Sequence, residues 1–141
     1  MNNQKRIEEI HYLFEARVCQ SGMVSKEFYD TILKAIADLP NDLAEWVTEK
    51  VLFWSSQNQL DFAHAVLLSE LEGYEGIVFL YDTLLKQSEK FQKNTILHEI
   101  AHVRLKHKLN QETPIAEKQE NEANELVEKW LRKEGKIVDI H

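Results

Sequence analysis

The side chains best suited to chemistry lie in one five-residue run, His98-Glu99-Ile100-Ala101-His102. On a helix, residues four apart share a face, so His98 and His102 can direct an imidazole nitrogen at one metal ion. Glu99 comes next round the helix, and its carboxylate can reach a water molecule beside that ion and accept its proton. Two imidazoles and a carboxylate favour zinc, because a catalytic zinc site has three protein ligands and one open position. The run therefore predicts a zinc site with Glu99 as catalytic base.

A third ligand has to come from elsewhere, and His107 is the nearest candidate in the sequence. If the helix continues, the nine residues from His98 to His107 turn it through roughly 180°, at about 100° each, onto the opposite face. We therefore expect His107 to be a helix-end or surface histidine. Glu120 is the better candidate, because it is a polar residue on an otherwise mainly apolar helix face. That face contains Ala116, Ala123, Asn124, Val127 and Leu131, with Trp130 beside it.

The helix that carries Glu120 has further residues that fit a metal site. A buried carboxylate needs a charged partner or a metal ion, and two histidines of the neighbouring helix would provide one. Ala123 is small enough to let the two helices approach, and Asn124, one turn after Glu120, can orient a ligand. Glu122 and Glu125 point to the other side, where we expect solvent. The sequence thus predicts His98, His102 and Glu120 as the metal ligands.

The elements that position these residues begin with helices. Apolar residues at helix spacing predict three of them in the N-terminal region. Ser25 would cap the second, which Pro40 closes, and Asn41 would cap the third. Because Trp54 falls on the inner face of the third helix, we expect residues 1–58 to be helical.

Two β-prone runs follow, Leu60–Leu68 and Ile77–Tyr81. A Gly-containing loop joins them, which predicts a β-hairpin, although the alanines and leucines of the first run also suit a helix. The helix with the two histidines is expected from about Ser88 to Leu109. The helix with Glu120 is expected from Pro114 to about Glu134, with Thr113 as its cap.

These elements predict one α+β domain over residues 1–141, because no repeat, low-complexity tract or long linker interrupts the chain. It consists of a helical N-terminal segment, residues 1–58, and of residues 59–134, which contribute the hairpin and the two metal-site helices. The expected fold is mostly helical, with a small antiparallel sheet packed beside the helix of His98 and His102.

Composition excludes several other classes of function. The formal net charge of −7 argues against direct binding to nucleic acid or to an anionic membrane surface. One cysteine, Cys19, rules out an internal disulfide framework, and we expect it to be a buried small apolar residue. Because the sequence shows neither a signal-peptide core nor an apolar run of about 18 residues, we expect a cytoplasmic protein.

The run from His98 to His102, followed by Glu120-Asn121-Glu122-Ala123-Asn124, resembles the ImmA/IrrE family of small bacterial and phage-associated metallopeptidases. The resemblance covers roughly Leu60 to Leu131, and Ile77–Tyr81 is similar to the family's edge strand. It implies a zincin-like fold with a gluzincin-like arrangement. It also implies His98, His102 and Glu120 as zinc ligands, Glu99 as catalytic base and Asn124 as a structural partner. Members of the family cleave helix-turn-helix repressors, so the resemblance implies a substrate of that kind.

The expected reaction is hydrolysis of a peptide bond in a protein substrate, which would lie extended along the strand Ile77–Tyr81. Candidates for stabilising the developing oxyanion are His64, Tyr74 and Tyr81. Two other classes of function stay open. The chain could be a non-catalytic zinc-containing binding module that acts as an anti-repressor by sequestration. It could also be a metal-free helical interaction protein whose histidines are satisfied by hydrogen bonds. The oligomeric state is left undetermined.

Overall fold

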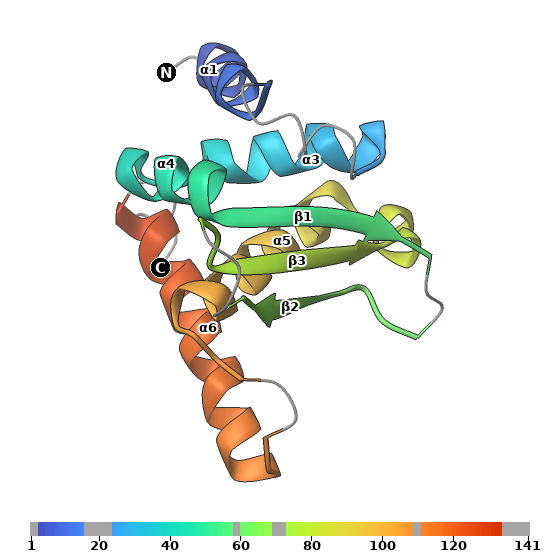
Figure 1. Cartoon of the computed structure of the whole chain (residues 1–141), viewed down its shortest axis with the longest axis vertical. Coiled ribbons are helices and arrows are strands. Elements are labelled where there is room, and N and C mark those ends of the chain that lie inside the picture. Colours follow the sequence, from blue (N-terminus) through green and yellow to red (C-terminus); the bar gives the residue numbers. More distant parts are fainter. Residues whose placement is uncertain (1–2, 16–23, 58–59, 69–72, 109–110, 134–141) are drawn as a thin grey trace.

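The structure is a computed structural model that describes residues 3–15, 24–57, 60–68, 73–108 and 111–133. It combines a small sheet with helices that pack on one of its faces and along its edges (Figure 1). The elements, in chain order, are α1 (Asn3–Glu15), α3 (Lys26–Ala37), α4 (Asn41–Lys50), β1 (Val51–Ser56), β2 (Ala63–Leu67), β3 (Gly76–Tyr81), the 3-10 helix η1 (Asp82–Lys86), α5 (Glu89–Arg104) and α6 (Thr113–Lys133).

The sheet has the strand order β1-β3-β2 and is mixed. The expected hairpin is confirmed, because β2 pairs antiparallel with β3 and Ala65 lies opposite Val78. The expectation of a purely antiparallel sheet is wrong, because β1 pairs parallel with β3 on its other side. The mixed pairing makes β3 the central strand and leaves β2 at an edge.

The expectation that residues 1–58 are all helical is wrong at its C-terminal end. Helix α4 ends at Lys50, and Val51 takes extended dihedral angles. Three consecutive residues, Val51, Leu52 and Phe53, are buried, and a β-branched and aromatic run of this kind suits a pleated surface. The carbonyl of Lys50 accepts a hydrogen bond from the backbone of Glu75, just before β3. Pairing with a distant strand thus overrides the helical pattern, and Trp54 is 46% exposed instead of facing inward.

One face of the sheet packs against α5, which lies behind it in Figure 1. Val78 and Leu80 are fully buried on this face. Gly76 shares their face, and a Cβ atom there would lie 2.7 Å from a γ-carbon of Val103 on α5. The helix and β3 therefore approach closely just beside His102.

The helix starts expected at Ser25 and Ser88 are confirmed, whereas the caps expected at Asn41 and Thr113 are wrong, because both residues are already helical. Ser25 caps α3, and Ser88 caps α5 by accepting a hydrogen bond from the backbone of Phe91. Before α4, the capping position is Pro40, without a side-chain hydrogen bond, and Asn41 is already helical.

The end of α5 also differs from the expectation, because the helix ends at Arg104 instead of Leu109. Lys106 has φ 59°, which is in the left-handed region and reverses the chain.

Helix α6 packs against α5, and the buried residues of α6 lie in its C-terminal half. Ala123, Val127 and Trp130 are buried there. The N-terminal half is mostly exposed, with Ile115 at 47%, and it projects beyond the sheet at the bottom of Figure 1. Glu120 lies near the junction of the two halves.

The expectations for Cys19 and for a helix end at Glu134 fall outside the described residues. Among the described residues, no helix combines the length and apolar character needed to cross a membrane.

Candidate metal centre

His98 and His102 lie one turn apart on α5, and their imidazole rings face each other edge to face. The ring centroids are 4.6 Å apart, and the two Nε2 atoms are separated by 3.0 Å. Both side chains are mostly enclosed, with exposures of 19% and 13%. The helix thus presents two imidazole nitrogens at nearly the same point.

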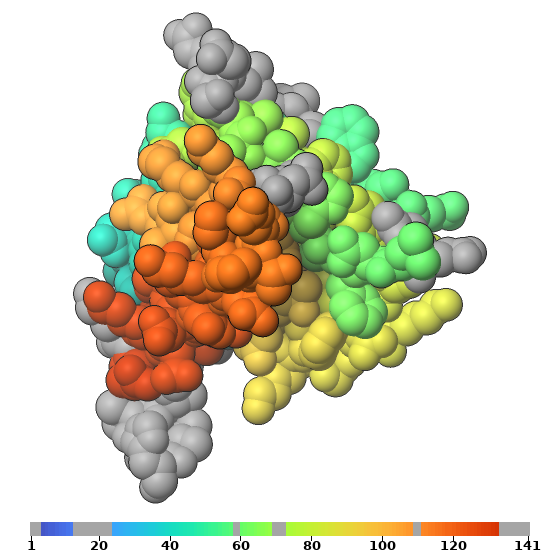
Figure 2. Space-filling model, turned by 90° about the horizontal axis from the view of Figure 1, so that it is seen from below, coloured from blue at the N-terminus to red at the C-terminus, as the bar shows by residue number. Residues whose placement is uncertain are grey.

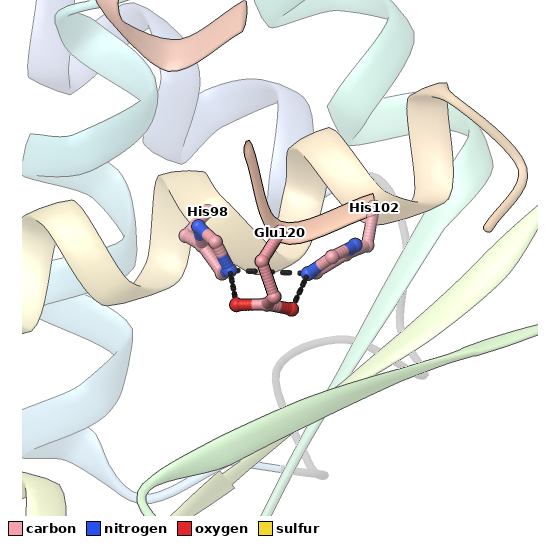
Figure 3. A group of neighbouring side chains, drawn as sticks. All are labelled: His98, His102 and Glu120. Carbon is pink, nitrogen blue, oxygen red and sulfur yellow. Dashed lines mark hydrogen bonds and ion pairs between the residues drawn. The ribbon is translucent and has the colours of Figure 1, made fainter. Parts of the chain in front are cut away.

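Glu120 brings a carboxylate to that point from α6 (Figure 3). Its Oε1 atom lies 2.9 Å from Nε2 of His98, and its Oε2 atom lies 2.8 Å from Nε2 of His102. Possible ligand atoms of the three residues all lie within 4.8 Å of one another. The group could therefore hold a metal ion, and it consists of the three residues that the spacing singled out.

Glu120 is nevertheless not the buried carboxylate that its place on the helix face predicted. Its side chain is 58% exposed, so it is not a buried carboxylate that requires a partner. Asn124, expected in the same apolar stripe, is exposed as well. The helical period placed Glu120 towards α5 correctly, but the N-terminal half of α6 lies too far from the core to be covered.

Glu99 is half-buried and lines the same cleft as His102 and Glu120. Burial, followed by the negative charges of Glu120 and Asp61, raises the pKa of Glu99 to about 8. A carboxyl group with such a pKa can both release and accept a proton near neutral pH.

Burial also lowers the pKa of His102, and the neighbouring His98 and His107 act in the same direction, against Glu120, which raises it. The imidazole of His102 is therefore kept neutral, which is the form that offers a lone pair to a metal ion.

His107 lies just after the end of α5, which agrees with the expected helix-end position, but it is not a surface residue. Its side chain is 9% exposed, with Nδ1 2.9 Å from Nδ1 of His102 and Nε2 2.9 Å from a carboxylate oxygen of Glu122. Glu122, expected in solvent, is therefore half-buried in an ion-pair position, whereas Glu125 is exposed as predicted. The helical extrapolation failed because the chain reverses at Lys106 before it reaches His107.

Strand β2 and the helices α5 and α6 line a cleft of about 380 Å³, which contains His102 and Glu120. One wall is the edge of β2 with Asp61 before it, and the other is α6 around Gln119. Figure 2 shows this side of the molecule, with α6 in orange beside the green segment that leads into β2. Glu99 is thus part of the same lining as the edge strand β2.

Of the three oxyanion candidates, His64 is among the described residues that line the cleft, and Tyr74 and Tyr81 are not. The ring of His64 packs on Phe79, and its Nδ1 atom is 2.9 Å from the hydroxyl of Tyr81. Burial raises the pKa of Tyr81, with the charge of Asp61 adding to it, so the phenol keeps its proton. Because side chains alternate along a strand, the ring of His64 lies with Phe79 and Tyr81 on the sheet face opposite to the one that packs on α5. His64 therefore lines the cleft at the edge of β2 without directing its ring at Glu99.

No protein-family model, curated protein or solved structure matches this chain.

Proposed function

We propose that the protein is a zinc-dependent endopeptidase of the ImmA/IrrE type with a zincin-like active site. The observation that supports this most strongly is the meeting of His98, His102 and Glu120 at one point, beside the enclosed carboxyl group of Glu99. A protein substrate, with a helix-turn-helix repressor as the candidate, rests on the resemblance of the two motifs.

The three residues fit zinc in kind and in spacing. Nitrogen and oxygen ligands about 2.0–2.2 Å from a tetrahedral zinc ion lie roughly 3.3 Å apart. The closest ligand atoms of the group lie 2.8–3.0 Å apart, so a small outward movement of the side chains would admit the ion. Among the described residues, no fourth histidine, cysteine or carboxylate joins the group. Three ligands and an open position are typical of catalytic zinc, whereas structural zinc is enclosed by four.

Zinc in such a site activates a water molecule and polarises a carbonyl group. The protein's own contribution centres on Glu99, whose carboxylate accepts the proton of the attacking water. Glu99 then passes that proton to the amine nitrogen as the peptide bond breaks. Its position in the cleft beside His102 suits this exchange, because a cation bound by His98, His102 and Glu120 would favour the carboxylate form of Glu99, which is the form that accepts a proton.

The substrate would bind along β2, not along Ile77–Tyr81 as the sequence suggested. Those residues form the central strand β3, whose two edges are both paired. The outer edge of β2 adjoins the cleft, with Ala63 and Ala65 in its wall. An extended peptide can add to such an edge by main-chain hydrogen bonds, which places its backbone beside Glu99.

The first experiment measures zinc per chain by mass spectrometry on the wild type, His98→Ala and Glu120→Ala, with Glu125→Ala as a control for an exposed carboxylate on the same helix. We expect about one zinc in the wild type and the control, and almost none in the two ligand variants. If the wild type binds no zinc even when it is offered, the metal-free interaction protein becomes the better interpretation.

The variant Glu99→Gln, prepared in the same way as the metal-ligand variants, tests catalysis. We expect this variant to keep its zinc and to lose cleavage of a peptide library or of candidate repressors by about 10²–10⁴-fold. Undiminished cleavage would rule out Glu99 as the base. Zinc binding with no cleavage by the wild type would favour the non-catalytic binding module.

A further inference from the structure

We propose that His107 and Glu122 are positioning residues that hold His102 in the orientation and tautomer needed for metal binding. The proposal rests on the metal site of the proposed function, but not on catalysis.

The three side chains form a continuous chain of contacts that leads away from the metal site. Nδ1 of His102 is 2.9 Å from Nδ1 of His107, and Nε2 of His107 is 2.9 Å from Oε1 of Glu122. Both nitrogens of His107 are thus engaged, so it is not a fourth ligand. Its contact is with the nitrogen of His102 that faces away from Glu120.

The positions of the protons follow from the chemistry of these groups. A metal ion takes the lone pair on Nε2 of His102, so the proton of the neutral ring sits on Nδ1 and needs an acceptor. His107 can accept it on Nδ1 if its own proton is on Nε2. Glu122 fixes that tautomer, because a carboxylate accepts and does not donate. Every donor in the chain then has an acceptor.

The contacts between His102, His107 and Glu122 depend on the reversal of the backbone at the end of α5. The backbone amide of His107 donates to the carbonyl of His102, and the left-handed Lys106 between them turns the ring of His107 back towards the helix. The helix α6 completes the arrangement on both sides of His102. Its Glu120 contacts Nε2 of His102 directly, and its Glu122 acts on the other nitrogen of His102 through His107. Glu120 and Glu122 are two residues apart, so they lie on different faces of α6.

Burial strengthens the hydrogen bonds between these side chains. The side chains of His102 and His107 are 13% and 9% exposed, and polar contacts shielded from water are stronger than the same contacts at the surface. Partners behind a metal-bound histidine are worth about 10–100-fold in metal affinity.

The test is the zinc affinity of the full chain, measured by competition with a chromogenic chelator. His107→Leu keeps the bulk of the ring but has no acceptor, whereas His107→Gln keeps an acceptor and a donor at similar positions. We expect His107→Leu and Glu122→Ala to bind zinc about 10–100-fold more weakly, and His107→Gln and Glu122→Gln to lose less. Glu125→Ala should stay within about twofold of the wild type, since Glu125 is exposed and outside the chain of contacts.

Two further measurements separate positioning from general support of the fold. Because Glu122 acts through His107, the double variant His107→Leu/Glu122→Ala should bind zinc no more weakly than His107→Leu alone. Imidazole ¹⁵N spectra of the zinc-loaded protein should show the proton of His107 on Nε2 and that of His102 on Nδ1. Losses of affinity that add in the double variant, or a doubly protonated His107, would overturn the proposal.

The outcomes also distinguish this inference from the proposed function. If wild type and Glu125→Ala bind zinc and His107→Leu binds it equally tightly, the inference fails and the metal site stands. If the wild type binds no zinc, both fail.

Discussion

At the scale of single residues, Glu99 has the most unusual environment in the cleft. Folding moves its carboxyl group from water into an enclosed place near two other carboxylates, Glu120 and Asp61, and both effects favour the protonated form. Its pKa is therefore about 8 in the folded protein, against 4.5 for an ordinary glutamate. A bound cation would stabilise the carboxylate, so this property belongs to the metal-free protein.

A dependence of stability on pH follows for the metal-free protein. Between about pH 5 and 8, unfolding releases the proton of Glu99, so the free energy of unfolding falls as the pH rises, by up to about 1.4 kcal/mol per pH unit. Glu99→Gln lacks this titration, so its stability relative to the wild type should increase over the same range. Urea unfolding in the presence of a chelator at pH 5, 6.5 and 8 measures the difference. Glu125→Gln serves as control, and a constant difference between Glu99→Gln and the wild type would contradict the expectation.

At the scale of the elements, the contact between β3 and α5 fixes where His102 stands relative to the sheet. Gly76 allows the close approach, because a Cβ atom there would lie 2.7 and 2.8 Å from the two γ-carbons of Val103. Val103 is fully buried and has little room to move. Small residues at such a crossing determine the distance between the helix and the sheet.

Gly76→Ala should therefore destabilise the protein by about 1–3 kcal/mol through overpacking. Val103→Ala removes the two γ-carbons, so the double variant Gly76→Ala/Val103→Ala should be more stable than the sum of the two single changes predicts. Urea unfolding of the four proteins measures the coupling. Strictly additive free energies would show that the contact does not limit the approach of β3 and α5.

The elements also show how far the sequence could predict the structure. Ser25, Ser88 and the hairpin carry local signals, and the spacing of His98, His102 and Glu120 identified the cluster because helical periods are regular. The strand β1 could not be recognised, since its apolar run continues the pattern of α4 and its partner β3 lies far along the chain. The position of His107 depended on a reversal at Lys106, where no glycine or asparagine marks the end of the helix.

At the scale of the whole molecule, the candidate site joins elements that are held with unequal strength. Helix α5 is buried among the sheet, α3 and α6, whereas the N-terminal half of α6 projects from the body (Figure 1). Since Glu120 is the contribution of α6 to the site, binding of zinc should hold this projecting half in place.

Amide hydrogen exchange can test this coupling. Without zinc, the amides around Ile115 should exchange much faster than those around Val127, because exposed helix ends open locally. Zinc should slow exchange in the turns around Glu120 and leave the amides around Val127 nearly unchanged. Equal protection of the amides in both halves of α6, with and without zinc, would contradict the expected coupling between zinc binding and the N-terminal half of α6. The variant His98→Ala, which lacks a ligand, is the control.

The exposure of Glu120 has a consequence for how the metal would leave. Its side chain is 58% exposed, so a chelator can approach this ligand while both histidines remain shielded on α5. Fraying of the first turns of α6 would then detach the carboxylate and leave the ion on the two imidazoles alone. Release would proceed in steps at the rate of local helix opening, without unfolding of the core. The lifetime of the occupied state would depend on whatever covers or uncovers the start of α6, including a substrate lying in the cleft.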